Sequence, residues 1–326
     1  MSILITGGAG YVGSHTMKIL GESEDVLCLD NLSHGNRESV DSSKLIVGNI
    51  SNKELLRAIF ATNNIEAVIH FVASGEVGES VTNPKICYNN NLVNGLALLD
   101  VMVECGIKKI IFSSSSAIFG EPKTPTLLED HPTNPISSYG ETKLIFEHIL
   151  RDYDRAYGLK HIALRYFNAS GADPSGLIGE DHEPENHIIP VLLEVALGQR
   201  PHFEVFGTNW PTEDGTCIRD YTHVCDLAQA HILALESLRK NNISAQYNLG
   251  NGNGYSVMDL IICARKITGH SIPFIERPRR PGDPSALISG SKLITKELGY
   301  IPNFPAIETI IETAWRWHST HPRGYK

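Results

Sequence analysis

The heptapeptide S-S-Y-G-E-T-K places Tyr139 and Lys143 four positions apart. Pro135, followed two residues later by a pair of serines, is a helix start signal, and Ser138 with Glu141 has the form of a capping box. A helix that begins here carries Tyr139 in its first turn and Lys143 one turn further along the same face. The spacing therefore predicts a phenol and an ammonium group side by side.

This pair could serve as a proton acceptor and its electrostatic partner. The first helical turn has unpaired N–H groups and the positive end of the helix dipole, which favour an anion such as a phenolate. A nearby cation lowers the pKa of a phenol from about 10 toward neutrality, so we expect Tyr139 to act as a general base with Lys143 stabilising its charge. Because Tyr-x-x-x-Lys is common by chance, the assignment depends on other features of the chain.

A glycine-rich turn, T-G-G-A-G-Y-V-G, begins at Thr6, after a predicted strand and before a predicted helix. This is the context that the dinucleotide-binding fingerprint requires. Gly7 and Gly10 let the backbone approach a pyrophosphate, Gly13 permits close packing of helix on strand, and the helix N-terminus receives the phosphates. Asp30 ends the second predicted strand and is placed to accept from a ribose 2′-hydroxyl. A carboxylate there favours NAD over NADP, whose 2′-phosphate it would repel.

With a nicotinamide nucleotide bound, the phenolate could remove the proton of an alcohol while hydride passes from the alcohol carbon to NAD⁺. Lys143 would also donate to the nicotinamide ribose. The run F-S-S-S-S-A-I-F-G follows the fifth predicted strand, at the carboxyl edge where such sheets bind ligands. Strand alternation places Ser113 and Ser115 on one face and Ser114 and Ser116 on the other. We expect one of these serines to bond the substrate hydroxyl.

Short β-branched runs alternate with longer amphipathic runs up to about residue 168. The strand-like runs are S-I-L-I-T, D-V-L-C-L-D, K-L-I-V-G, E-A-V-I-H-F, K-K-I-I-F-S and H-I-A-L-R-Y-F, and the helical patterns cover residues 11–21, 53–63, 83–104 and 138–157. This rhythm is typical of a parallel sheet covered on both faces. We therefore predict an α/β fold with a doubly wound parallel (Rossmann) sheet, and an NAD-binding domain over residues 1–175.

The pattern loosens after about residue 175 into mixed helices and short strands, with turns at P-T-E-D-G and R-R-P-G-D-P. We expect a smaller mixed α/β C-terminal domain over residues 176–326, which supplies substrate specificity. A segment near residues 220–245 begins as a helix and is expected to pack back on the sheet.

The composition is typical of a soluble globular protein, since 41% of the 326 residues are hydrophobic and 20% are charged. The formal net charge of −9 argues against a nucleic-acid partner or an anionic membrane surface. No apolar run approaches the ~20 residues of a membrane span, and M-S-I-L-I leaves no room for a signal peptide. The six cysteines are scattered without zinc-ligand spacing, which favours a cytoplasmic location.

Two histidines, His182 and His187, lie in the acidic stretch E-D-H-E-P-E-N-H. Their spacing matches no zinc motif, and hydride chemistry needs no metal. We therefore expect a solvated acidic loop here and no metal site.

The chain resembles the extended short-chain dehydrogenase/reductase family, and within it the 4-epimerases of UDP-hexoses, over nearly its whole length. The motifs that carry the resemblance are T-G-G-A-G-Y-V-G-S-H, L-D-N-L, H-F with V-G-E-S-V, F-S-S-S, Y-G-E-T-K, L-R-Y-F-N, P-T-E-D-G-T-C-I-R-D-Y, Y-N-L-G and R-R-P-G-D. The block with P-T-E-D-G-T and R-D-Y is the most telling for the epimerase branch. Counting back from Phe119 and Gly120, the family's catalytic serine falls on Ser115.

The resemblance implies an isomerase that interconverts UDP-glucose and UDP-galactose through a 4-keto sugar, with tightly held NAD and with Tyr139, Lys143 and Ser115 as catalytic residues. It implies cofactor contacts by Gly7, Gly10, Tyr11, Val12, Gly13, Asp30, Asn31, Asn49, Ile50, Phe71, Asn90, Lys143 and Tyr166. It implies substrate contacts by Ser115, Tyr139, Asn168, His187, Phe206, Arg219, Arg280, Asp283 and Leu287. The arginines suit this role because a planar guanidinium can bond phosphate with two N–H groups.

Three positions depart from the family pattern. Gly75 stands where a lysine commonly reaches the cofactor pyrophosphate, and Asn49 stands where an aspartate usually meets the adenine. Asn94 replaces a glycine inside a helical pattern and need not disturb the site. We therefore expect NAD to dissociate more readily than from relatives with both polar contacts. At a further position, Leu287, the family places the residue that decides whether an N-acetyl group fits the sugar pocket.

Several alternatives stay open. A 4,6-dehydratase would need an acid after the fifth strand, where S-S-A offers none. A dehydrogenase with exchanging cofactor, a 4-epimerase of another UDP-sugar such as UDP-GlcNAc or UDP-xylose, and a non-catalytic NAD-sensing protein remain. By resemblance, the helices near residues 83–104 and 138–157 would pair in a homodimer.

Overall fold

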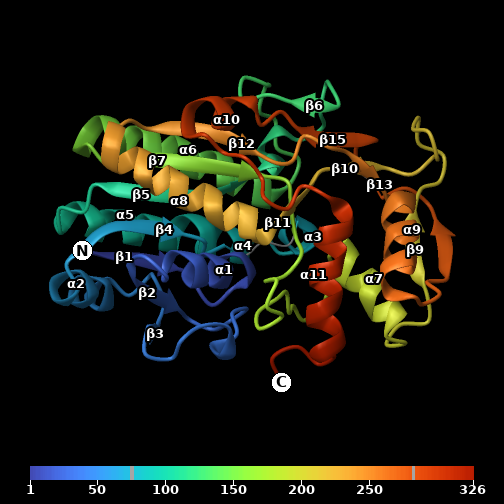
Figure 1. Ribbon diagram of the computed structural model, residues 1–326. Helices are drawn as coiled ribbons and strands as arrows, with labels where there is room; N and C mark the ends of the chain where they lie inside the picture. Colours follow the sequence, from blue (N-terminus) through green and yellow to red (C-terminus); the bar gives the residue numbers. More distant parts are fainter. Residues whose placement is uncertain (74–76, 281–282) are drawn as a thin grey trace.

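The computed structural model describes residues 1–73, 77–280 and 283–326, and its centre is a seven-stranded parallel sheet (Figure 1). In spatial order its strands are β12 (Ala245–Leu249), β7 (Lys160–Tyr166), β5 (Lys109–Ser115), β4 (Ile65–His70), β1 (Ser2–Thr6), β2 (Asp25–Asp30) and β3 (Leu45–Val47). Every neighbouring pair in this sheet is parallel. The strand order reverses direction along the chain on either side of β1, as in a doubly wound fold.

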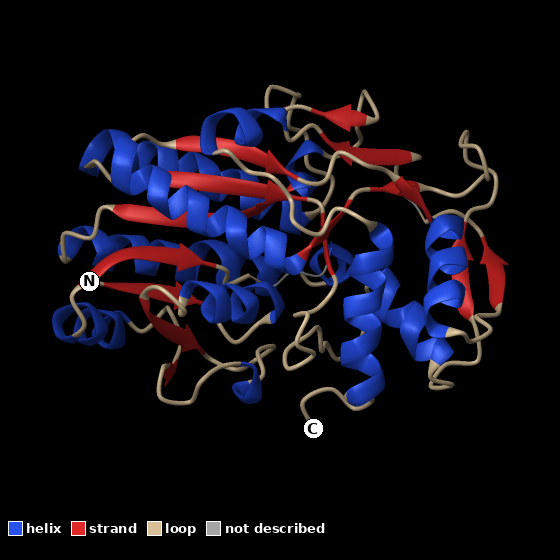
Figure 2. Cartoon of the chain, in the orientation of Figure 1, coloured by secondary structure: helices blue, strands red, loops and turns tan. Residues whose placement is uncertain are grey.

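Helices cover both faces of this sheet (Figure 2). On one face, α1 (Tyr11–Leu20) and α8 (Val224–Asn241) pack on alternate residues of β1. On the other face lie α2 (Lys53–Thr62), α5 (Asn94–Glu104) and α6 (Ser138–Tyr157). A strand that is buried on both sides tends to be a continuous apolar run, and β1 accordingly has I-L-I at its centre, with all five of its residues buried. The predicted doubly wound α/β fold is confirmed.

The expected helix over residues 83–104 is divided into three pieces. They are α4 (Pro84–Tyr88), a π-helical turn η2 (Asn89–Val93) and α5, and α3 (Val77–Thr82) precedes them. Asn94 is the first residue of α5. A π-helical turn inserts an extra residue into the helical repeat and often marks a functional site.

The cap of α6 differs by one residue from the expected capping box. The helix begins at Ser138, and the side chain that caps it is that of Ser137, whose hydroxyl accepts a hydrogen bond from the Gly140 N–H at 3.1 Å. Both serines are good N-cap residues, so the sequence alone favours neither. Tyr139 still falls in the first turn.

The rest of the chain builds a second region around α7 (Ile188–Ala196), α9 (Val257–Thr268) and α11 (Ile307–Thr320), which share one apolar core. A four-stranded sheet lies between this core and the parallel sheet, with β13 (Tyr255–Ser256), β10 (Ile218–Arg219), β15 (Ala286–Ser289) and β6 (Thr126–Leu127) in that order. Smaller elements are β8 (Asn168–Ser170) with β11 (Tyr221–His223), β9 (Phe203–Phe206) with β14 (Phe274–Arg277), α10 (Lys292–Leu298) and the 3₁₀ turns η1 (Arg37–Ser39) and η3 (Ser116–Phe119).

The two regions exchange segments along the chain. β6 comes from the first half of the sequence but pairs with β15 of the second region, while α8 and β12 come from the second half and complete the parallel sheet. Among the described residues, no helix combines the length and apolarity needed to cross a membrane.

Candidate active site

The carboxyl ends of the parallel strands bring the predicted chemical groups to one edge of the sheet. β4 ends at His70, β5 ends at Ser115 and β7 ends at Tyr166, and the last two residues are paired in register. The glycine turn follows β1 at the same edge. This edge is where open α/β sheets bind their ligands.

Tyr139 of α6 lies against the end of β5. The Ser115 side chain acts on the Tyr139 hydroxyl by lowering the pKa of the phenol, and the Ser115 oxygen accepts from the Ala117 N–H at 3.2 Å. Gly140 makes this approach possible, since a Cβ there would lie 2.4 Å from the Ala117 carbonyl oxygen. The structure thus brings Ser115, and not its neighbours in the serine run, to the tyrosine.

Lys143 is 2% exposed and lies beneath the same edge. Its Nζ donates to the Ser113 carbonyl oxygen at 2.5 Å and lies 5.6 Å from the centre of the Tyr139 ring. The Ser113 hydroxyl is hydrogen-bonded to the hydroxyl of Tyr166. Tyr139, Lys143 and Ser115 therefore lie together, and Ser113 serves as part of their support.

In the protein without a cofactor, the pKa values of the two groups do not show the expected effect of Lys143 on the tyrosine. Burial raises the pKa of Tyr139 to about 12, and the Ser115 side chain opposes that shift only in part. Burial also lowers the pKa of Lys143 to about 7. Desolvation penalises the charged forms of both groups, which explains why a buried lysine one turn away does not bring the phenol to neutrality.

A buried ion pair that the sequence analysis missed holds α6 on the sheet. Glu147, one turn after Lys143, accepts from Arg165 of β7 at 2.9 and 2.6 Å and from the Ser114 hydroxyl at 2.6 Å. Glu147 is 5% exposed and Arg165 7% exposed. The signal was present in the sequence as a glutamate four residues after the lysine and an arginine inside an apolar strand.

The glycine turn has the tight geometry that a dinucleotide needs. Gly7 has a φ of +75°, and a Cβ at Gly13 would lie 2.2 Å from the Gly7 carbonyl oxygen. Asp30 is buried, and its carboxylate accepts from the Ala9 N–H at 3.0 Å and the Leu32 N–H at 2.8 Å. Each carboxylate oxygen has a second lone-pair position, so Asp30 can still accept from a ribose hydroxyl.

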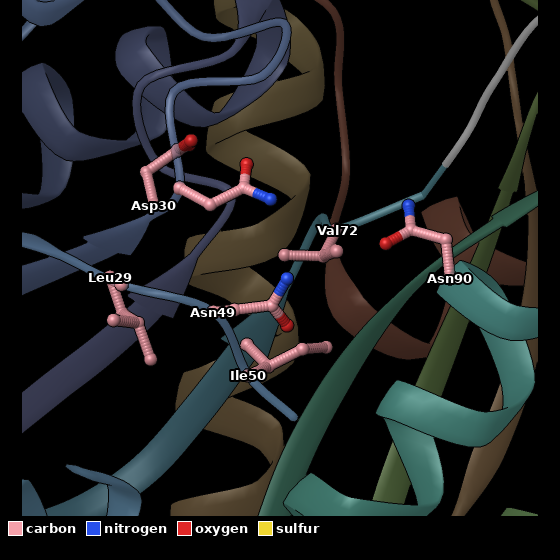
Figure 3. A pocket seen from close by; sticks show the side chains of 8 residues that line it. Leu29, Asp30, Asn49, Ile50, Val72 and Asn90 are labelled. Carbon is pink, nitrogen blue, oxygen red and sulfur yellow. The ribbon is translucent and has the colours of Figure 1, made fainter. Parts of the chain in front are cut away.

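A small pocket opens beside Asp30 (Figure 3). Its lining residues come from β2, from the segment after β3, from the segment after β4 and from η2, and they are Leu29, Asp30, Asn31, Gly48, Asn49, Ile50, Val72 and Asn90. Five of the residues implied as cofactor contacts therefore surround one space. The Asn49 side-chain oxygen accepts from the Ser51 N–H at 2.9 Å, which fixes the amide.

The other implied cofactor residues lie around the same edge. The Tyr11 hydroxyl donates to the Gly171 carbonyl oxygen at 2.5 Å, and Val12 packs on the core beneath the sheet. The rings of Phe71 and Tyr166 flank His231 of α8, with centroid distances of 4.6 and 6.0 Å. Gly10 is the N-cap of α1. Gly75 lies outside the described residues.

Most of the implied substrate residues lie on the short strands of the second region. Arg219 of β10 donates to the carbonyl oxygens of Ile218 and Pro284 at 2.9 Å each and to Asp283 at 3.3 Å. It is paired in register with Leu287 of β15, which packs beside Phe119. The guanidinium is thus held in place beside the predicted gate residue.

Two further implied residues form a cation–π contact. The guanidinium carbon of Arg280, which is exposed, lies 3.7 Å from the centre of the Phe206 ring. Asn168 of β8 donates from its amide to the Asp220 carbonyl oxygen at 2.8 Å. These contacts orient both polar groups without burying the arginine.

His187 is the N-cap of α7, and the loop before it differs from the solvated loop expected there. Glu180 and Glu185 are 3% and 8% exposed, and His187 contacts Glu180. His182 lies 3.3 Å from Glu180 and 3.8 Å from Glu185. The expectation of solvated acids is wrong because tertiary contacts cover a segment whose composition is hydrophilic.

Comparison with known proteins identifies the family to which the chain belongs. The sequence model of the family described as "NAD dependent epimerase/dehydratase family" matches residues 3–250. The chain is 50% identical to a UDP-glucose 4-epimerase of Halalkalibacterium halodurans, over 100% of this chain and 98% of that protein. A crystal structure of a UDP-glucose 4-epimerase is similar with a TM-score of 0.98 and 47% identity, covering 100% of both chains.

A second crystal structure, of the UDP-glucose 4-epimerase from Bifidobacterium longum in complex with NAD⁺ and UDP, is similar with a TM-score of 0.92 and 37% identity, covering 100% of both chains. The family match spans the glycine turn, the serine strand and the Tyr-Lys helix together. The chain therefore belongs to the NAD dependent epimerase/dehydratase family.

Proposed function

We propose that this protein is an isomerase that interconverts UDP-glucose and UDP-galactose by inverting the configuration at C4 of the sugar. The observation that carries the proposal is the convergence of Tyr139, Ser115 and Lys143 at the edge of the sheet, in a chain whose full-length relatives are named UDP-glucose 4-epimerases. The reaction needs a base, a hydroxyl that orients the sugar and a hydride acceptor in one place.

The glycine turn and the pocket beside Asp30 fit NAD. Gly7, Gly10 and the N-terminus of α1 would take the pyrophosphate, and Asp30 would accept from the adenosine ribose. Asn31, Asn49, Ile50 and Asn90 would surround the adenine side. When bound in its oxidised form, NAD supplies a hydride acceptor and a positive charge next to the reacting carbon.

The chain's own groups would move the proton. Tyr139 would take the proton of the sugar 4-hydroxyl, and Ser115, whose side chain acts on the phenol, would orient that hydroxyl. Lys143 would stabilise the phenolate and donate to the nicotinamide ribose. The 4-keto sugar would then turn about its link to the diphosphate. Hydride would return to the opposite face of C4, while Tyr139 gives its proton back to the sugar oxygen.

Binding would depend on the nucleotide so that the sugar can turn. Arg219 and Asn168 would hold the diphosphate, and Arg280 and Asp283 the phosphate and ribose, since guanidinium groups bond phosphate with two N–H groups. Phe206 and His187 complete this side of the ligand. The sugar itself would be enclosed by smaller contacts that include Leu287.

We further propose a cytoplasmic homodimer. Exposed apolar side chains gather on α3, α4 and η2, where Val81, Ile86, Tyr88 and Val93 are 37% to 62% exposed. A second copy of the chain would cover them if these helices pair with α6 of the partner. The six free cysteines support a reducing compartment.

The direct test is conversion of UDP-galactose to UDP-glucose by the purified chain without added NAD. We expect turnover in wild type and nearly none in Tyr139→Phe. A wild type that carries NAD but leaves UDP-galactose unchanged would contradict the epimerase proposal and favour NAD sensing or another sugar. Turnover that requires a stoichiometric supply of NAD⁺ would instead identify a dehydrogenase.

A further inference from the structure

We infer that Glu180, His182, Glu185 and His187 form a binding site for a divalent transition-metal cation, with Zn²⁺ as the best match. One ligand atom from each of these four side chains lies within 4.8 Å of all the others. The inference goes beyond the proposed epimerase activity, because neither the hydride transfer nor the proton transfer uses these groups; His187 is shared, since it is also proposed to contact the nucleotide.

The separations suit a four-coordinate ion. With bonds of about 2.0–2.2 Å, a tetrahedral zinc places its ligand atoms roughly 3.4 Å apart. His182 Nδ1 lies 3.3 Å from Glu180 and 3.8 Å from Glu185, and His187 Nδ1 lies 4.0 Å from Glu185. His187 Nδ1 is in direct contact with Glu180, and this pair would have to separate to admit an ion. Small side-chain rotations would therefore close the set around one ion.

Burial and charge give the second reason. Glu180 and Glu185 are 3% and 8% exposed, and two neighbouring carboxylates in such a setting repel each other unless a cation lies between them. Both carboxylates form ion pairs with the imidazoles of His182 and His187. With the imidazoles neutral, two carboxylates balance the charge of one divalent cation.

The ligand loop is anchored from several distant elements. Trp317 of α11 donates to the Glu180 carbonyl oxygen at 3.0 Å, and Arg200 donates to the Glu185 carbonyl oxygen at 2.9 Å. One carboxylate oxygen of Glu185 accepts the N–H groups of residues 186 and 187 at 2.8 Å each. Such outer hydrogen bonds orient metal ligands before the metal arrives.

The ligand chemistry selects the kind of ion and its role. Two imidazoles with two carboxylates suit zinc and its neighbours, whereas Mg²⁺ and Ca²⁺ prefer oxygen ligands in larger coordination shells. Four protein ligands leave no open position, which is the arrangement of a structural ion. The ring of Tyr11, at the start of α1, stands edge-on to His182 at 6.2 Å, so the ion would tie this loop to the side of the glycine turn.

The test compares zinc binding by the full chain and by two histidine variants. After chelator treatment and buffer exchange with a reductant present, wild type should retain one Zn²⁺ per chain and show a higher Tm, and Mg²⁺ should not replace it. His182→Gln should bind zinc at least ~10-fold more weakly. His270→Gln, which removes an exposed imidazole elsewhere, should bind as wild type does. Equal zinc affinity in the two variants, or no retained zinc in wild type, would overturn the inference.

If His182→Gln does not fold, the visible spectrum of wild type loaded with Co²⁺ still tests whether these four side chains bind a metal. We expect visible bands of a four-coordinate nitrogen and oxygen site, lost in Glu185→Gln, which keeps the acceptor oxygen but removes the charge. A strong near-ultraviolet thiolate band would assign the metal to a cysteine and overturn the inference. UDP-galactose turnover is measured separately, so failure of the metal site and failure of the epimerase proposal are distinguishable.

Discussion

The catalytic edge and the nucleotide-sugar side of the site hold their charged groups in opposite ways. At the edge, Lys143 is 2% exposed and rests on a carbonyl oxygen, and the buried pair of Glu147 and Arg165 lies one turn below it. On the other side, Arg280 is exposed and stacks on a ring at the surface. This difference matches two tasks. Proton and hydride transfer require the reacting groups to be held in a fixed geometry, whereas nucleotide binding only has to keep the UDP group bound while the sugar rotates.

The strongest test of this division removes the base. Tyr139→Phe deletes the hydroxyl and keeps the ring, so kcat should fall by ~10²–10⁴, as expected for lost acid–base catalysis, with UDP affinity little changed. Arg280→Met should show the reverse pattern, with weaker UDP binding and kcat largely kept. Steady-state kinetics and calorimetry with UDP give both numbers, and a similar profile in the two variants would remove the distinction.

The second test asks whether the buried pair fixes the edge. Glu147→Gln leaves Arg165 buried and without its counter-charge, so we expect a loss of about 3–5 kcal/mol in the free energy of unfolding. The matched control is Glu204→Gln, which breaks an exposed pair with Arg277 and should cost less than about 1 kcal/mol. Urea denaturation of wild type and the two variants measures the difference. Equal losses in the free energy of unfolding would mean that the buried pair stabilises the protein no more than the exposed pair does.

Buried imidazoles make the parallel-sheet half sensitive to acid. Burial lowers the pKa of His70 to about 3 and that of His231 to about 4, from an ordinary value near 6.5. Below pH ~6.5 the unfolded chain takes up protons that the folded chain refuses, so stability falls as pH drops toward those folded values. Each imidazole contributes about 1.4 kcal/mol per pH unit in that window.

Denaturation midpoints at pH 7, 5.5 and 4.5 check this slope. His231→Phe keeps a ring against Phe71 and Tyr166 and removes one titrating group, so its stability should decline less steeply. An unchanged slope in the variant would show that other groups govern acid unfolding.

The fourth test concerns the lysine under the edge. Lys143→Met keeps most of the apolar stem and removes the positive charge, so the pKa that governs kcat should rise by about one unit or more. The measurement is the pH profile of kcat between pH 6 and 10. An unshifted profile would leave Lys143 with a role in packing and cofactor contact only, and the phenol would then depend on the cofactor charge alone.

The smallest expected effect lies in the sugar pocket. Leu287 is smaller than tyrosine and offers no hydroxyl, so burying an N-acetyl group beside it costs little provided that its amide finds a partner. We expect UDP-glucose and UDP-galactose as main substrates, with activity on the N-acetylated pair at least ~10-fold lower, or about 1.4 kcal/mol. Leu287→Tyr should abolish the lower activity and spare the main one. Wild type without N-acetyl activity, and Leu287→Ser without a gain of it, would place the gate elsewhere.

Sequence patterns predicted those parts of the molecule that local chemistry determines. The alternation of β-branched and amphipathic runs predicted the parallel sheet, helix periodicity placed Tyr139 and Lys143 on one face, and strand alternation put Ser113 and Ser115 on one face. The choice of Ser115 came from the family resemblance. The exact cap of α6 could not be predicted, since Ser137 and Ser138 are equally good caps.

Tertiary burial was the part that the sequence concealed. The loop around Glu180 reads as hydrophilic, and its covering comes from Trp317 and Arg200, which are remote in the chain. The raised pKa of the Tyr139 phenol has the same origin, because desolvation depends on everything that packs around the ring. Neither the burial of this loop nor the pKa of Tyr139 can be predicted from the spacing of residues in the sequence.

The late position of β12 in the chain has a consequence for synthesis on the ribosome. Six strands of the parallel sheet have emerged by residue 166, but β7 remains an open edge until residues 245–249 follow it. The apolar face of β1 and α1 also stays exposed until α8 is synthesised, because Leu227, Ala230 and Ala234 of α8 cover it. A nascent chain of about half length therefore exposes a pairing-competent strand and an unfilled core, the features that recruit chaperones and promote aggregation. A chain stopped near residue 175 should accordingly be insoluble, although it contains the whole glycine turn and the Tyr-Lys helix.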